Sequence, residues 1–200
     1  MDPRTQARSD CRAARAALST SQREAASAAV CKRFRASIFY PRARRIAFFW
    51  PLGPELDLRP LMQSALRHHK QCYLPVVRPN GEMVFIRVLP DTRFVRGPFG
   101  ITEPTWLPER ILPAHCLDTV CMPLLGFDLQ LNRLGMGGGY YDRAFAFKRS
   151  NAQSPILIGT AFACQQYSAL PIADWDIPLD AVITERGLLS KPQGLPRTSY

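Results

Sequence analysis

The hydrophobic positions have a helical period up to about residue 45 and a strand-like period beyond it. Val30, Phe34 and Ile38 recur every four residues and predict the buried stripe of one helix. Ser21 and Glu24 predict a capping box at the start of that helix. Upstream, four basic residues recur at helical spacing and would share one face of an earlier helix: Arg4, Arg8, Arg12 and Arg15. Residues 1–40 are therefore expected to form a basic pair of helices.

Short apolar runs of strand length follow, separated by turns and helical segments. The predicted strands are residues 46–50, 72–77, 83–89, 119–127, 156–162 and 181–184, and the predicted helices are residues 58–69 and 140–148. Asn80-Gly81 suits a tight reversal, whereas the proline- and glycine-rich residues 90–115 predict a long loop with little regular structure. Buried strands that alternate with helices indicate an α/β sandwich with a largely parallel central sheet.

Composition places the chain in the globular class. It has 200 residues, of which 46% are apolar and 21% charged, and we expect one domain over residues 1–200 with a frayed tail from Arg186 onwards. No apolar run approaches the roughly 18–20 residues that cross a bilayer, and no signal-peptide core is present. Asp2 and Asp10 argue against an organellar targeting peptide. We therefore expect a cytoplasmic protein with no membrane partner. We also expect a monomer.

The cysteines and histidines lack the spacing of a disulfide or metal framework. The six cysteines are spread along the chain without a Cys-x-x-Cys pair, and a domain of this size needs no disulfide. We therefore expect reduced, mostly buried thiols and no zinc site. No Gly-x-Ser-x-Gly elbow accompanies the three histidines, so a nucleophilic triad has little support.

Positive charge is concentrated at the start of the chain. The formal net charge is +10, and residues 1–45 hold eleven basic and three acidic side chains, which is +8 of that total. Such a field attracts a polyanion or a polyphosphate. A nucleic-acid-binding protein that uses this arginine-rich N-terminus is one alternative, but the aromatic residues lie mostly on predicted buried strands. A sugar-phosphate or acyl-CoA enzyme on the same sandwich is another.

The most specific stretch runs from Arg133 to Arg143, between a predicted strand and a predicted helix. Four glycines within five residues let the main chain approach a ligand closely, and N–H groups near the helix start point towards negative charge. A merely tight turn seldom requires four glycines. Neither standard phosphate-loop pattern is present. The segment therefore predicts a phosphate cradle framed by Arg133, Asp142 and Arg143, which simple nucleic-acid binding would leave unexplained.

Two carboxylates are candidates for holding a metal beside this cradle. Asp142 falls in the first turn of the predicted helix, where it suits either the helix dipole or Mg²⁺ bound against phosphate oxygens. Asp176 precedes the last predicted strand, at the strand end where open α/β sheets bind ligands. A turn-forming role for Asp176 is an equal alternative.

A third segment, residues 50–57, leaves the first predicted strand with an aromatic ring and two carboxylates. Trp50 offers a stacking surface and Glu55 a bidentate acceptor for a planar, nitrogen-rich ligand, whereas Asp57 suits a helix cap before Leu58.

Without an activated nucleophile, catalysis is expected to depend on positioning and charge neutralisation. Phosphoryl transfer is the reaction class that requires the fewest other catalytic groups.

Taken together, these residues resemble the 5-formyltetrahydrofolate cyclo-ligase family, also called 5,10-methenyltetrahydrofolate synthetase. The strongest marker is residues 133–143 with the preceding residues 123–128, supported by residues 55–57, 73–76, 99–104 and 175–179. The resemblance covers most of the chain and implies a three-layer α/β/α sandwich. It also implies an ATP- and Mg²⁺-dependent enzyme that converts 5-formyltetrahydrofolate into 5,10-methenyltetrahydrofolate, ADP and phosphate, without nucleic acid.

The resemblance also assigns roles to individual residues. The implied ATP contacts are Arg4, Arg8, Arg133, Leu134, Gly135, Met136, Gly137, Gly138, Gly139, Tyr140 and Tyr141. The implied catalytic residues are Arg133, Tyr141 and Asp142, the metal contacts Asp142 and Asp176, and the folate contacts Trp50 and Glu55. Arg4 stands where the family has lysine, which keeps the charge but changes the geometry. Some relatives carry a basic residue where Met136 or Gly138 stands. Neutralisation of the phosphate charge would therefore depend more on Arg4, Arg8 and Arg133 in this chain.

Overall fold

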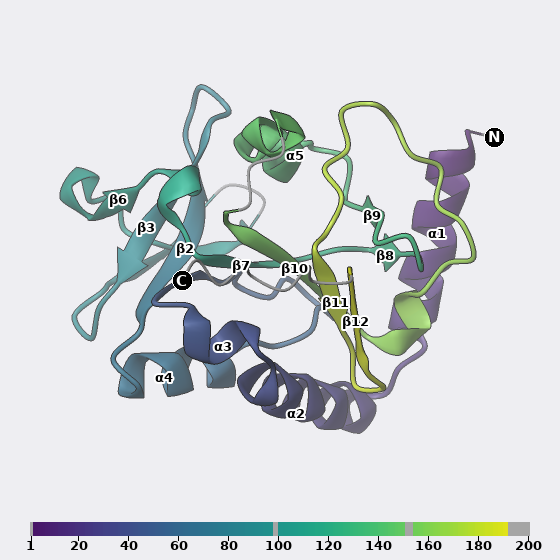
Figure 1. Cartoon of the computed structure of the whole chain (residues 1–200), viewed down its shortest axis with the longest axis horizontal. Coiled ribbons are helices and arrows are strands. Elements are labelled where there is room, and N and C mark those ends of the chain that lie inside the picture. Colours follow the sequence, from purple (N-terminus) through teal and green to yellow (C-terminus); the bar gives the residue numbers. More distant parts are fainter. Residues whose placement is uncertain (1, 98–99, 151–153, 192–200) are drawn as a thin grey trace, which may run out of the picture.

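The central element of the fold is an eight-stranded sheet in a computed structural model that describes residues 2–97, 100–150 and 154–191 (Figure 1). Its five inner strands run parallel, and the remaining three pair antiparallel at the two sides. Across the sheet the order is β12 (Leu188–Ser190), β11 (Ala181–Ile183), β10 (Ile156–Thr160), β7 (Thr119–Met122), β1 (Arg45–Ala47), β2 (Gln71–Val77), β3 (Met83–Val88) and β6 (Ile111–Leu112). The predicted α/β class with a largely parallel sheet is confirmed.

The neighbouring parallel strands β1, β7 and β10 have their carboxyl ends at the same end of the sheet. Ile46 of β1 is paired with Thr119 of β7, and Ile156 of β10 is paired with the same Thr119. The segments that follow these strands therefore leave the sheet side by side, at the carboxyl ends where α/β sheets bind ligands. Residues 48–57 follow β1, and residues 123–128 follow β7.

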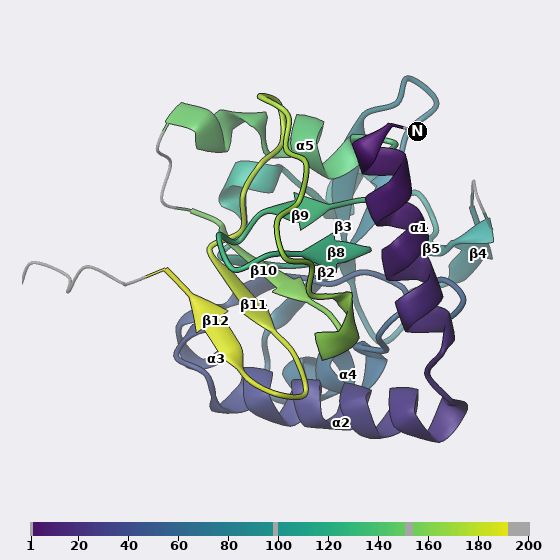
Figure 2. The same cartoon turned by 90° about the vertical axis from the view of Figure 1, so that its right-hand side faces the viewer.

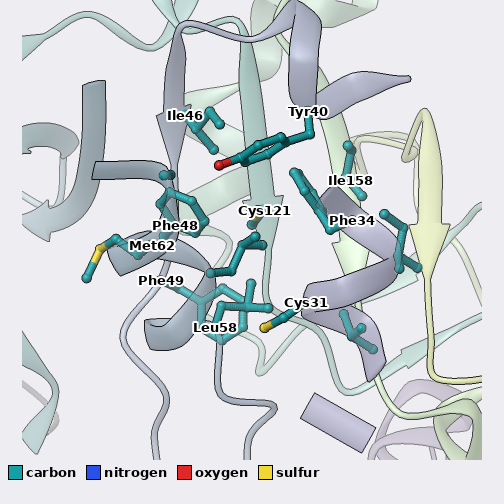
Figure 3. Close-up of a cluster of buried hydrophobic side chains, with 14 of the residues drawn as sticks. Cys31, Phe34, Tyr40, Ile46, Phe48, Phe49, Leu58, Met62, Cys121 and Ile158 are labelled. Atoms are coloured by element: carbon teal, nitrogen blue, oxygen red, sulfur yellow. The ribbon is translucent and has the colours of Figure 1, made fainter. Parts of the chain in front are cut away.

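One face of the sheet is covered by helices α2 (Thr20–Ala36), α3 (Phe39–Arg42) and α4 (Arg59–Arg67) (Figure 1). Figure 3 shows the core beneath them, in which Phe34 and Tyr40 from this helical layer lie among side chains of the sheet. The Phe34 and Tyr40 rings meet edge to face at a centroid distance of 6.3 Å. Such aromatic contacts add to the free energy of burying both rings.

The opposite face is covered by a mixed layer. It contains α5 (Tyr140–Ala144), the 3₁₀-helix Ala146–Ser150 and the hairpin of β8 (Gly126–Phe127) and β9 (Arg133–Leu134). Phe145 is fully buried there against Phe85 of β3, with ring centroids 5.7 Å apart. The sheet thus lies between helices on one side and this mixed layer on the other (Figure 1).

Helix α1 (Pro3–Ala16) lies apart from the layer formed by α2–α4. It packs against β8 and the 3₁₀-helix Ala163–Gln165, and Figure 2 shows it running alongside the β8–β9 hairpin. Asp2 caps its start by accepting hydrogen bonds from the N–H groups of Arg4 and Thr5. The two predicted N-terminal helices are therefore present, but only α2 belongs to the helical layer on the central sheet, whereas α1 packs against β8 and the 3₁₀-helix.

The start and end of α2 differ from the prediction. The N-cap is Ser19, which forms the capping box with Gln22 instead of the predicted Ser21 and Glu24. Both serines are chemically suitable caps, and the helix starts at the earlier one. Ile38 is 48% exposed because α2 ends at Ala36, so it is outside the buried stripe formed by Val30 and Phe34.

Several predicted elements are shorter than the apolar runs suggested. Strand β7 ends at Met122, because Pro123 has no N–H to continue the ladder, and β8 is a separate strand. Strand β1 is residues 45–47 instead of 46–50, and α5 ends at Ala144 before a 3₁₀ segment. The antiparallel pairing of β2 with β3 confirms the predicted reversal at Asn80-Gly81, where Gly81 has a φ of +80°.

Two regions predicted to be irregular contain regular structure. Residues 90–115 hold a small antiparallel sheet of β4 (Phe94–Arg96) and β5 (Thr102–Pro104), as well as β6. The start of the predicted frayed tail forms β12, which pairs with β11. The rest of that tail, residues 192–200, lies outside the described residues. Among the helices in residues 2–97, 100–150 and 154–191, none has the length and apolar character to span a membrane.

The contrast between Phe34 and Ile38 gives a test of the α2 packing. We expect Phe34→Ala to lower the free energy of unfolding by about 3–5 kcal/mol, because it removes a fully buried ring and leaves a cavity. Ile38→Ala is the control, and should change it by less than about 1 kcal/mol. Urea denaturation with an unchanged m-value would measure both. Equal losses for the two variants would contradict the observed end of the helix.

Candidate functional site

The glycine segment predicted to bind phosphate connects β9 to α5. Gly137 and Gly139 have φ values of +108° and +64°, which favour glycine. A Cβ atom at Gly135 would lie 2.8 Å from Arg133 Nη1, and one at Gly138 would lie 2.7 Å from the Tyr140 ring. Each of the four glycines therefore has a backbone or steric reason to be there.

Asp128 organises the turn that precedes this segment. Its carboxylate is fully buried and accepts hydrogen bonds from the N–H groups of Gln130, Asn132 and Leu170, at 3.0–3.1 Å. The Asn132 amide donates to it as well, at 2.9 Å. These bonds fix the hairpin that presents Arg133, and they tie it to the segment that leads to Asp176.

Arg133 and Asp142 form the inner ion pair of the site. Arg133 Nη2 donates to Asp142 Oδ1 at 2.8 Å, and the two side chains are 5% and 15% exposed. The same oxygen accepts a hydrogen bond from the Ile177 N–H at 3.2 Å. The Arg133 guanidinium also lies over the Tyr141 ring, 5.8 Å from its centroid. Burial raises the pKa of Tyr141, so its hydroxyl stays protonated at neutral pH.

Helix α1 brings two more arginines to this place. Arg4 donates to both oxygens of Asp176, at 2.6 and 3.0 Å, and Arg8 Nε donates to the Gly135 carbonyl at 3.1 Å. Arg8 also lies against Gly137, since a Cβ there would be 3.8 Å from its guanidinium carbon. The structure therefore brings Arg4 and Arg8 together with the glycine segment, although more than 120 residues separate them in the chain.

The two ion pairs form one charge cluster. Burial alone would raise the pKa of Asp176, but hydrogen bonds from Arg4 and from the Ala173 N–H outweigh it and hold that pKa below its usual value. Arg133 contributes to this lowering, and Asp142 in turn helps to raise the pKa of Arg4. Because each cation senses both carboxylates, a new anion at this place would meet arginines that are already oriented.

A cavity of about 270 Å³ opens beside the cluster. Its lining comes from two segments: Asn132, Arg133, Ile172, Ala173, Asp174, Asp176, Ile177 and Pro178. The combination of apolar walls with a few convergent charged groups is typical of small-molecule sites.

Glu55, in the segment that follows β1, is held by a main-chain hydrogen bond and an arginine. Its Oε2 atom accepts a hydrogen bond from the Leu52 N–H at 3.0 Å, and its Oε1 atom is 3.7 Å from Arg15 Nη1. Burial raises the pKa of Glu55, whereas the Leu52 N–H and Arg15 act in the opposite direction. The negative charge of Glu55 adds to the effect of burial in raising the pKa of Tyr141.

Trp50 packs between an aromatic ring and an arginine. Its ring lies 5.0 Å from that of Phe94 and has the Arg59 guanidinium 5.5 Å from its centroid. Asp57 was predicted to cap a helix that begins at Leu58, but α4 begins at Arg59 with Leu58 as its N-cap and without a side-chain capping bond. Asp57 instead accepts hydrogen bonds from the N–H and the guanidinium of Arg59. The predicted folate contacts thus lie next to different partners: Trp50 beside Phe94, and Glu55 beside Arg15.

Sequence reasoning missed two residues of the site. Arg15 was seen only as part of an arginine-bearing face, yet it is buried and paired with Glu55. Asp128 was seen only as part of a matching stretch, and its buried hydrogen bonds need the folded hairpin to be recognised.

The six cysteines are free, and four of them are buried, as predicted. Within the described residues, no group of three or more His, Cys, Asp or Glu side chains is arranged to hold a metal ion.

Comparisons with known proteins identify the family of the chain. Residues 1–185 match the family model described as 5-formyltetrahydrofolate cyclo-ligase. The chain belongs to the 5-formyltetrahydrofolate cyclo-ligase family. The family's curated member from Haemophilus influenzae is 37% identical over 178 residues, covering 88% of this chain and 94% of its own. The member from Escherichia coli K12 is 38% identical over 144 residues, covering 71% and 78%.

Solved structures of cyclo-ligase relatives share the fold. The NMR structure of 5,10-methenyltetrahydrofolate synthetase from Aquifex aeolicus has a TM-score of 0.81 at 29% identity, covering 98% of this chain and 97% of its own. A 5,10-methenyltetrahydrofolate synthetase from Mycoplasma pneumoniae has a TM-score of 0.72 at 23% identity, which supports the fold alone. The resemblance seen in the sequence is therefore confirmed, and the nucleic-acid alternative gains no support.

The ion pair between Arg4 and Asp176 predicts a pH-dependent contribution to stability. Because the pKa of Asp176 is depressed in the folded state, its stabilising effect is present above the ordinary Asp pKa and is lost as pH falls through the depressed value. We expect Arg4→Met to lower the free energy of unfolding at pH 7 by about 1–3 kcal/mol, between typical exposed and buried pairs. This difference should shrink at pH 3.

Urea unfolding at the two pH values would measure this effect. Arg12→Met is the matched control, since Arg12 is an exposed arginine on the same helix. A loss in Arg4→Met that is the same at pH 7 and pH 3 would contradict the role of the Asp176 charge.

Proposed function

We propose that this protein uses ATP to convert 5-formyltetrahydrofolate into 5,10-methenyltetrahydrofolate, with release of ADP and phosphate. Family membership supports the folate reaction. The observation that carries the ATP dependence is the convergence of Arg4, Arg8 and Arg133 on the glycine segment beside two carboxylates. Cations that approach a backbone rich in N–H groups provide the charge and the space that a triphosphate requires.

The triphosphate would lie along the glycine segment, residues 133–141. Arg8 is anchored to Gly135 through Nε, and its two Nη groups donate to no atom of the described residues. They are therefore free to bind phosphate oxygens. Arg4 would transfer its two hydrogen bonds from Asp176 to phosphate, which conserves the number of charge-assisted bonds. Tyr140 and Tyr141 would form the wall at the α5 side.

Asp142 fits a Mg²⁺ ion better than Asp176 does. Its Oδ1 atom is used by Arg133 and Ile177, whereas Oδ2 accepts no hydrogen bond within the described residues. Both oxygens of Asp176 are occupied by Arg4 and the Ala173 N–H, so it becomes available only when Arg4 turns towards phosphate. Mg²⁺ commonly uses one or two carboxylates together with substrate phosphates. When bound, it would offset the charge of the reacting phosphates.

The folate would bind on the Glu55 side of Tyr141. A pteridine presents adjacent N–H groups at its edge, and the Glu55 carboxylate is a bidentate acceptor for such a pair. Trp50 with Phe94 would provide the aromatic surface beside it. The formyl-bearing part of the substrate would then lie towards the glycine segment.

The reaction needs activation of a poor leaving group. The formyl oxygen attacks the γ-phosphorus of ATP, an O–P bond forms, and the bond to the β-phosphate oxygen breaks to release ADP. N10 then attacks the formyl carbon and loses its proton, and the oxygen leaves as phosphate. Arg133, Arg4 and Arg8 stabilise the negative charge that develops on the transferred group.

A direct assay tests this proposal. Purified protein incubated with 5-formyltetrahydrofolate and MgATP should produce the ultraviolet absorption of the methenyl product and one ADP per product. Omitting ATP should abolish both signals. Methenyl product formed without ATP consumption would contradict the proposed mechanism.

The role of Asp142 gives a sharper prediction. Asp142→Asn keeps the shape of the side chain and removes its charge, so we expect kcat to fall by at least about 100-fold, the scale of one lost electrostatic contact in a transition state. The Mg²⁺ concentration for half-maximal rate should rise. Asp91→Asn serves as the control, because Asp91 is an exposed carboxylate paired only with Arg110 in the described chain. Near-normal turnover of Asp142→Asn would remove this residue from the mechanism.

A further inference from the structure

Arg15 is buried on α1 without the hydrogen bonds that usually accompany a buried guanidinium. Its side chain is 7% exposed, and within the described residues it donates no hydrogen bond. Its closest charged partner is Glu55, at 3.7 Å, which is an ion-pair distance but too long for a good hydrogen bond. Burying a charge with so few bonds costs folding free energy, so stability does not explain why an arginine stands here.

The surroundings of Arg15 point to the substrate side of the molecule. Arg15 Nε and Thr160 Oγ1 both lack a hydrogen-bond partner in the described chain, and both line a small cavity of about 10 Å³. Glu55 lines the same cavity. The cavity lies where the segments after β1, β7 and β10 meet, which is the ligand-binding edge of the sheet.

We propose that Arg15 is a positioning residue that acts through Glu55, holding this carboxylate charged and oriented towards the pteridine. The proposal rests on the function proposed above, in which Glu55 binds the folate. Arg15 does not itself touch the reacting atoms. One helix, α1, would then serve both halves of the site, with Arg4 and Arg8 on the phosphate side and Arg15 on the folate side.

The groups around Glu55 determine the sign of the expected effect. The Leu52 N–H and Arg15 lower its pKa, burial raises it, and Tyr141 faces it as a neutral phenol. Around Arg15, Arg12 is the nearby cation, and the thiols of Cys11 and Cys164 are neutral because burial raises their pKa values. Removing the positive charge of Arg15 therefore moves the pKa of Glu55 upwards.

The kinetic test compares Arg15→Met, which keeps an apolar stem, with Arg15→Lys, which keeps the charge. In Arg15→Met we expect KM for 5-formyltetrahydrofolate to rise about tenfold at neutral pH, with KM for ATP within about twofold of wild type. The acidic limb of kcat/KM for the folate should move upwards by about one pH unit. Arg15→Lys should restore most of both changes, and Arg12→Met should show neither.

A double-mutant cycle separates this role from a merely structural one. If Arg15 acts through the Glu55 charge, adding Arg15→Met to Glu55→Gln should raise KM for the folate no further. The double variant also removes both buried charges, so it keeps the comparison possible should Arg15→Met alone fold poorly. Additive losses in the cycle would overturn the proposal.

A measurement without turnover keeps the inference distinct from the proposed function. Protein labelled with ¹³C at the glutamate carboxyl carbons gives six resonances, and Glu55→Gln identifies the one from Glu55. We expect that resonance to titrate about one unit higher in Arg15→Met than in wild type, and close to wild type in Arg15→Lys. Identical titration in all three proteins would overturn the inference even if the enzyme is active. A shifted titration in a protein that forms no methenyl product would instead contradict the proposed function.

Discussion

The site depends on matching buried or half-buried guanidinium groups with carboxylates from distant parts of the chain. A charge removed from water needs a partner, and here each pair joins two elements: Arg4 of α1 to Asp176, Arg133 of β9 to Asp142, and Arg15 of α1 to Glu55. Helix α1 also packs against β8 and a 3₁₀-helix. The ion pairs therefore place its arginines where they can serve a ligand. Arginines held by carboxylates can exchange a partner for phosphate with little reorganisation.

Local chemistry made part of this site visible in the sequence. The four glycines between Arg133 and Tyr140 are a pattern that few structures other than a ligand cradle require, and each now has a φ value or a close contact that explains it. Apolar runs predicted the inner strands for a similarly local reason, since strands buried on both faces must be apolar throughout. The nearness of Arg4 and Arg8 to the glycine segment was different. It came from the family resemblance, because helical spacing alone says only that they share a face.

The remaining features depend on tertiary structure that no window of the sequence contains. Ser19 and Ser21 are equally good caps, and only the packing of α2 decides between them. Arg15 and Glu55 are 40 residues apart, and nothing in either segment shows that the two charges meet. The ends of β7 and α5 were overestimated because apolar residues continue past them, into turns that are buried for other reasons. Burial predicted from hydrophobicity locates the core well, but it locates the ends of elements poorly.

The two sides of the central sheet have a consequence for self-association. The eight-stranded sheet ends on one side in β12, of three residues, and on the other in β6, of two residues. An exposed strand edge invites pairing with another chain, and brevity is one way in which natural sheets avoid it. Each outermost strand offers only two or three residues of main chain as a template. The apolar inner strands, which would polymerise readily if they were exposed, are thus shielded from intermolecular strand addition.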